Sequence, residues 1–336
     1  MSQLKKSVVF SAVYLCIFFM IPLISMQVFS IMVFSLGILF VVELFSILLT
    51  KFFKIPKKIS IMISIIILFA SVVFLMFFLI PTIIGEVSNF MNFLNNFFKN
   101  KDWEVLFNNN FPEIEENMSN FIESLEPKIM EFLNGMLVQI PGYGQKIGSF
   151  LFYVALITIY GSFYMDNFKR GVEKLFPKSV RAVSVKFVAD LYKDLKHFVV
   201  TTLFAALFVG IAAFFAMNFL GIRYTILLAF WAALTNFIPV VGVIFEFIPL
   251  ILVGISAGIT KMLILLIIMS IIHFSAFIFF LFVLKGKSSI NPVAIIISIL
   301  VFGYIFGTIG PLIAVPIGIT IKVFWTYYIT PMLERG

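Results

Sequence analysis

Long stretches without charge are the feature that most constrains this chain. Residues 7–50 contain one charged side chain, Glu43, and residues 59–84 contain none. A helix needs about 20 consecutive apolar residues to cross the hydrocarbon core of a bilayer. The whole chain is 62% hydrophobic and 12% charged, against about 25% charged in soluble domains. We therefore expect an all-α polytopic membrane protein.

The apolar runs predict about six full transmembrane helices. As a single helix, residues 7–50 would form a rod of about 66 Å, which is too long for one crossing. We split this run near Pro22–Ser30 into a helical hairpin of two spans. Four further spans are predicted at residues 59–84, 147–165, 198–221 and 262–284.

Two more apolar segments, 224–256 and 291–329, are interrupted in the middle. The breaks read "NFIPVVG" (236–242) and "FGTIGP" (306–311). They leave limbs of about 23–27 Å, slightly short of a full crossing. Paired interruptions of this kind indicate the discontinuous helices of a transporter site. Re-entrant hairpins fit the positive-inside rule better than single broken crossings, because they leave the lysines after the last full span in the cytoplasm. The two forms remain alternatives.

Charge divides the chain into three predicted regions. Residues 1–84 form an N-terminal region of three spans, and residues 147–336 form the transport region with both interrupted helices. Between them, residues 85–146 carry nine acidic and four basic side chains and read as an amphipathic helical, extracytoplasmic segment. Clustered lysines around the first two spans place the N-terminus in the cytoplasm, and the same count places the C-terminus there. The expected location is the bacterial cytoplasmic (inner) membrane.

Small and polar residues at or near the two breaks are the candidates for a transport path. Hairpin tips expose backbone groups and helix ends to a polar solute. The candidates at the first break are Thr235, Asn236, Pro239, Gly242 and Glu246, and those at the second are Asn291, Gly307, Thr308, Gly310 and Pro311.

Three ionisable residues fall at membrane depth, where such side chains are rare and usually functional. Glu246 lies one helical turn beyond Gly242 and is the first candidate for proton coupling. The alternative is a neutral carboxyl that only holds the hairpin together by hydrogen bonds. Glu43 could lie near the cytoplasmic interface, and His273 could be a packed imidazole, so both are secondary candidates for proton coupling.

Three features of the chain occur together in a known family. They are a span ending in Asp166 before a cytoplasmic helix, an Asn-x-Ile-Pro-x-x-Gly break from Asn236, and a Phe-Gly-x-x-Gly break from Phe306 followed by Ala-Val-Pro. In these features the chain resembles the autoinducer-2 exporters, a family of bacterial membrane proteins. The resemblance covers the layout of the whole chain and the motifs of its second half. It implies export of autoinducer-2, and sodium/proton exchange is described for some relatives. This chain departs from the family at Val243, where a proline is common, and in residues 273–287, which are almost wholly apolar.

The sequence contains no motif for several other kinds of chemistry. No Gly-x-x-x-x-Gly-Lys-Ser/Thr motif is present, so ATP is not expected as the energy source. Two distant histidines and one cysteine, Cys16, predict neither a metal site nor another cofactor. No nucleophile–base pair is recognisable in the sequence, so an enzyme is not expected. Lysines and arginines lie between the apolar runs, so the expected partner is the lipid bilayer and not nucleic acid.

The sequence therefore favours a secondary transporter that exports a small polar solute similar to autoinducer-2. The first alternative is a monovalent cation/proton antiporter, which would need Glu246 or Glu43 to exchange protons. The second is a structural or regulatory membrane protein that keeps the fold without transporting. A homo-oligomer is expected.

Overall fold

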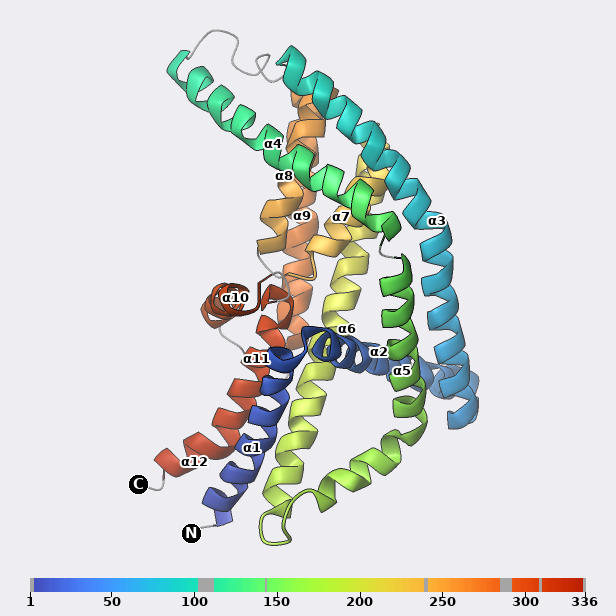
Figure 1. The fold of residues 1–336 in the computed structure, drawn as a ribbon, viewed down its shortest axis with the longest axis vertical. Coiled ribbons are helices and arrows are strands. Elements are labelled where there is room, and N and C mark those ends of the chain that lie inside the picture. The colour runs from blue at the N-terminus through green and yellow to red at the C-terminus, as the bar shows by residue number, and fades with distance from the viewer. Residues whose placement is uncertain are drawn as a thin grey trace. The chain divides into compact units, whose positions relative to one another are not determined.

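The computed structural model describes residues 3–101, 112–142, 144–238, 241–284, 292–307 and 310–334, and these residues form helices and short turns only (Figure 1). The elements in chain order are α1 (Gln3–Ile24), α2 (Met26–Phe53), α3 (Lys57–Asn100), α4 (Pro112–Gly142), α5 (Gly144–Lys174), α6 (Arg181–Leu220), α7 (Thr225–Thr235), α8 (Val241–Ala257), α9 (Ile259–Leu284), α10 (Pro292–Phe306), α11 (Gly310–Phe324), a π-helical turn (Trp325–Ile329) and α12 (Thr330–Leu333).

Seven stretches of the described helices are long and apolar enough to cross a bilayer. Six correspond to the predicted full spans, which confirms the all-α polytopic membrane class. The seventh, Gly310–Leu333, is the second limb of the second interrupted segment. The prediction that this limb is too short to cross was wrong, because the π-helical turn and α12 continue α11 to 24 residues. The other limbs, α7, α8 and α10, have 11, 17 and 15 residues.

The first predicted hairpin breaks at one residue, Ser25. Its backbone is extended (φ −154°, ψ 105°), and its hydroxyl accepts a hydrogen bond from the Val28 N–H at 3.3 Å. This is the geometry of a helix N-cap, which satisfies a backbone donor that the start of α2 would otherwise leave unpaired. The break lies within the predicted window of Pro22–Ser30.

Two helices are longer than any single crossing. α3 has 44 residues and continues without interruption from the predicted third span into the acidic segment. At about 66 Å, it extends well beyond a hydrocarbon core of about 30 Å. In the same way, α6 is one helix of 40 residues that begins well before the predicted span at residues 198–221. The boundary drawn at residue 84 therefore lies inside a helix.

The chain forms two compact units by its internal contacts. Unit 1 comprises Met1–Ser71, Gly148–Thr201 and Phe282–Gly336, and unit 2 comprises Val72–Ile147 and Thr202–Leu281. Long helices such as α3 and α6 contribute to both units. Each unit is described below by itself.

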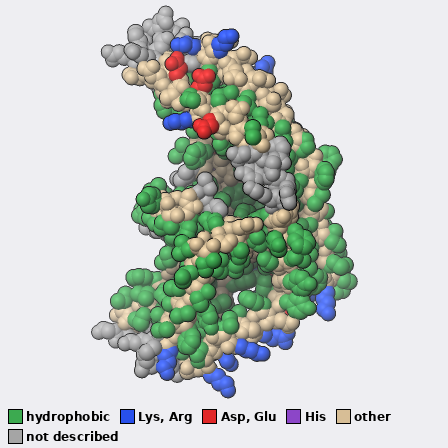
Figure 2. Space-filling view, viewed as in Figure 1, with side chains coloured by type: hydrophobic (Ala, Val, Ile, Leu, Met, Phe, Trp, Pro, Cys, Tyr) green, Lys and Arg blue, Asp and Glu red, His purple; other side chains and the backbone are tan. Residues whose placement is uncertain are grey.

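In unit 1, buried hydroxyl groups connect α1, α6 and the C-terminal helix. Ser7 Oγ lies 2.6 Å from Ser184 Oγ, and Ser11 Oγ lies 2.7 Å from Tyr328 Oη. Tyr328 belongs to the π-helical turn and is completely buried. This network keeps the ends of α1 and α12 near each other (Figure 1). Figure 2 shows Lys and Arg side chains gathered along the same edge of this unit, which includes the α5–α6 turn.

Unit 2 has an apolar core and an apolar exterior. The core brings α3 residues such as Leu94 together with Met217 of α6, Leu250 of α8 and Leu265 of α9. On the outside, large side chains such as Phe219 (90% exposed) face away from the core. An exterior of this kind is unfavourable in water and suits lipid.

Candidate functional site

The first interrupted segment is a hairpin in unit 2. The indole Nε1 of Trp231 in α7 donates a hydrogen bond to the backbone oxygen of Phe245 in α8 at 3.1 Å. In one continuous helix, residues 14 positions apart would be separated by about 21 Å. The two limbs therefore fold back on each other, which favours the re-entrant hairpin over a single broken crossing. In unit 1, α10 and α11 also pack against each other.

Both hairpins close at a glycine that starts the second limb. A Cβ atom on Gly242 would lie 1.9 Å from the backbone oxygen of Thr235, and one on Gly310 would lie 1.9 Å from that of Phe302. No side chain fits at either distance. Gly242 and Gly310 are therefore needed for close backbone packing within each hairpin.

The other candidates divide between the two units. Thr235, Asn236, Gly242 and Glu246 come together at the tip of the α7–α8 hairpin in unit 2. In unit 1, Gly307 ends α10 with a left-handed backbone (φ +60°), and Gly310 and Pro311 begin α11. Pro239, Asn291 and Thr308 lie outside the described residues.

Glu246 and His273 form a buried pair in unit 2. Glu246 is 0% exposed, and its Oε2 lies 2.9 Å from Nε2 of His273 on α9. The contact is close, but the ring N–H is not aligned with the carboxylate as in a hydrogen bond, and Oε1 of Glu246 has no hydrogen-bond partner among the described residues. The Thr235 hydroxyl, 3.5 Å from Oε2, lies closer to the backbone oxygen of Trp231, at 2.9 Å.

The surroundings of Glu246 are unusual for a carboxyl group. A buried carboxylate is costly unless a positive group compensates it. Here the nearest side-chain partner of Glu246 is the imidazole of His273, and both groups lie in the interior of unit 2. Sequence reasoning named both residues separately and missed that they pair.

A pocket of about 440 Å³ lies next to His273, entirely within unit 2. Its volume is within the usual range for small-molecule sites, roughly 300–1,000 Å³. Two residues named as candidates from the sequence, Asn236 and His273, line it, whereas its other lining residues were not predicted as site residues. The lining residues are Thr202, Ala205, Asn236, Val243, Phe247, Ser270, His273, Phe274, Ala276, Phe277 and Phe280.

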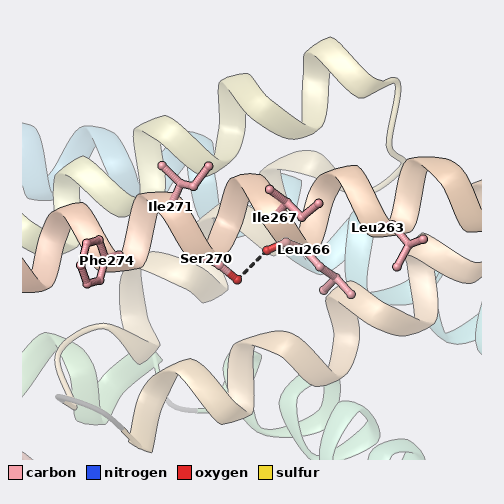
Figure 3. A pocket seen from close by; sticks show the side chains of 6 residues that line it. All are labelled: Leu263, Leu266, Ile267, Ser270, Ile271 and Phe274. Atoms are coloured by element: carbon pink, nitrogen blue, oxygen red, sulfur yellow. Dashed lines mark hydrogen bonds between the residues drawn. The ribbon is translucent and has the colours of Figure 1, made fainter.

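A second hollow, on α9, has a different character. Figure 3 shows its six residues on this one helix, with the Ser270 hydroxyl bonded to the backbone oxygen of Leu266 one turn earlier. The other lining residues are apolar, and Ile267 and Phe274 are well exposed. With its only hydroxyl already paired, this surface is suited to lipid and offers no polar site.

Glu43 lies in unit 1 and is held by several partners. Its Oε2 accepts a hydrogen bond from the Tyr192 hydroxyl at 2.7 Å and lies 2.9 Å from Lys196 Nζ, and its Oε1 lies 3.5 Å from Lys169 Nζ. These contacts connect α2 with α5 and α6. The geometry is that of a structural ion-pair cluster, which supports the simpler interpretation of this residue.

We expect Glu43→Gln to weaken the fold without altering proton coupling. The amide keeps the shape but loses the charge that both lysines face, and hydrogen bonds to charged groups contribute about 1.5–3 kcal/mol each. The melting temperature of the detergent-purified protein should fall by several degrees, while the pH dependence of transport stays that of the wild type. A changed pH dependence with unchanged melting would contradict the structural role.

No group of three or more His, Cys, Asp or Glu side chains is placed to hold a metal ion in the part of the chain that the structure describes.

Comparison with known proteins agrees with this architecture. The model of the family described as "AI-2E family transporter" matches residues 9–330. A Thermotoga maritima protein named "putative transport protein" is 28% identical over 331 residues, which cover 98% of this chain and 97% of the relative. The Bacillus subtilis proteins YueF and YrrI, named in the same way, are 24% and 22% identical and cover 81% and 83% of this chain and 77% and 81% of their own lengths. The chain therefore belongs to the AI-2E transporter family and is a multi-pass membrane protein.

Proposed function

We propose that this transporter exports a small uncharged solute in exchange for protons, which it carries on the Glu246–His273 pair. The observation that supports this most is the complete burial of Glu246 against a titratable partner, at the tip of a re-entrant hairpin. The resemblance to autoinducer-2 exporters names autoinducer-2 as the first solute to test. The apolar exterior and the long apolar helices put the lipid bilayer around the protein, and the family membership favours transport over catalysis.

The proposed cycle couples the pair to the neighbouring pocket. His273 lines the pocket, whereas Glu246 lies behind it, within 2.9 Å. A proton that enters from the pocket side reaches the imidazole first and then the carboxylate. Neutralising the pair removes a buried ion pair, and this changes how firmly α8 is held to α9. A solute in the pocket contacts residues of both helices, so its binding and the protonation of the pair affect each other.

Monovalent cation/proton antiport remains the second candidate. The observation in its favour is Glu246 Oε1, a buried carboxylate oxygen without a hydrogen-bond partner among the described residues. Oxygen ligands of this kind suit a hard cation. The described lining of the pocket includes no carboxylate, which favours the uncharged solute. We also propose that the protein forms a homo-oligomer. A purely structural membrane protein with this fold would move no solute in the transport assay below.

The proposed location is the bacterial inner membrane, with both termini in the cytoplasm. After Cys16→Ser, a cysteine placed at Lys178 should react with a membrane-impermeant maleimide only from the cytoplasmic side. One placed at Ser124 should react only from outside. Both positions are exposed, in the α5–α6 turn and on α4. Labelling of both positions from the same side would contradict this topology.

The transport proposal is tested with purified protein in proteoliposomes. With autoinducer-2 outside and an imposed pH gradient, the wild-type protein should accumulate the solute, and dissipating the gradient should stop accumulation. In a parallel series, a sodium gradient is imposed and no autoinducer-2 is added. Sodium-dependent proton movement without solute movement would favour the antiporter.

A further inference from the structure

The pocket beside His273 restricts the chemistry of its occupant. Its described lining includes no Lys, Arg, Asp or Glu, so nothing there compensates a charged ligand directly. Four of the eleven lining residues are phenylalanines: Phe247, Phe274, Phe277 and Phe280. Aromatic faces favour a flat apolar partner.

Thr202 adds one unsatisfied polar atom to this apolar lining. Its Oγ1 is buried and has no hydrogen-bond partner among the described residues. Ser270, which also lines the pocket, differs because its hydroxyl already donates to the backbone oxygen of Leu266. Buried polar groups are nearly always paired, so an unpaired one that lines a pocket is a candidate contact for a ligand.

We propose that the pocket binds an uncharged, flat aromatic molecule with one hydrogen-bonding group, and that Thr202 determines this specificity. The aromatic ring packs among the phenylalanines while its polar group pairs with Thr202 Oγ1. The proposal rests on the transport function above, since it names the class of solute that the pocket accepts.

The test uses the full-length protein in lipid nanodiscs with tritium-labelled indole as the probe. Unlabelled indene, which has the shape of indole without the N–H group, and unlabelled ribose serve as competitors. The wild-type protein should bind indole saturably, indene should compete about tenfold more weakly because it lacks one hydrogen bond, and ribose should not compete. Thr202→Val keeps the shape and removes the hydroxyl. In this variant, indole should bind only as well as indene, whose affinity stays unchanged.

Thr201→Val is the matched control, because Thr201 is also buried but does not line the pocket. It should keep the preference for indole. The proposal is overturned if indole binding does not saturate, if ribose competes as well as indole, or if Thr202→Val keeps the wild-type preference for indole over indene. The autoinducer-2 assay tests the transport function independently. If proton-coupled transport persists there while the indole preference is absent, only the ligand class is wrong.

Discussion

Replacing Gly242 by alanine should destabilise the protein markedly, because the new methyl group would lie 1.9 Å from the backbone oxygen of Thr235. The clash is with backbone and not with a flexible side chain, so α7 and α8 would have to separate. We expect a cost of about 2–3 kcal/mol or more, as for an overpacked core, and a melting temperature roughly 5–10 °C lower in detergent. Fluorescence-detected size-exclusion chromatography after heating measures this directly.

Gly85→Ala is the matched control for this variant. Gly85 lies in a helix of the same unit, and a Cβ atom there would meet nothing within 4 Å. This change should be neutral or slightly stabilising, because alanine favours helix more than glycine does. Equal melting temperatures for the Gly242 and Gly85 variants would contradict the close packing of the hairpin.

The second large effect is expected from Glu246→Gln, which should abolish accumulation driven by a proton gradient. Glutamine has nearly the same shape and can still form hydrogen bonds, but it cannot release or accept the coupling proton. Downhill exchange of solute should persist, because Glu246 does not line the pocket. Uptake into proteoliposomes, measured with and without a pH gradient, separates the two activities.

Glu43→Gln is the appropriate comparison, because it removes the other carboxyl group predicted at membrane depth. Its partners are lysines and a tyrosine, whereas Glu246 faces a histidine. The Glu43 variant should retain gradient-driven accumulation once its lower stability is taken into account. Loss of accumulation in both variants to the same degree would show that the assay reports folding and not coupling.

The sequence predicted the helical breaks well because they depend on local chemistry. Ser25 caps a helix start, and the Pro and Gly residues of "NFIPVVG" interrupt a helix wherever they occur. The position of glycine in each hairpin also has a local cause, close backbone packing, although the sequence did not reveal that cause. The length of the last limb was misjudged because a π-helical turn continues it.

The sequence indicated the pairing of Glu246 with His273 only indirectly, because the pair depends on how α8 and α9 pack against each other. α8 and α9 meet at Gly258, whose φ of +103° suits a tight turn. In two antiparallel helices joined by such a turn, residues at similar distances from the turn lie at the same level. Glu246 and His273 lie at similar distances on either side, so this signal could have identified them. Nothing comparable marked Thr202, because its unpaired hydroxyl is apparent only once α6, α7, α8 and α9 are assembled.

Proton movement through the protein tests the coupling role of Glu246 most directly. Proteoliposomes that contain a pH-sensitive dye receive a pulse of autoinducer-2, and a second series receives indole. With the wild-type protein, the internal pH should change as solute enters, and with Glu246→Gln the solute should enter without any change in pH. Identical pH changes in the two proteins would contradict the proposal that Glu246 carries the coupled proton.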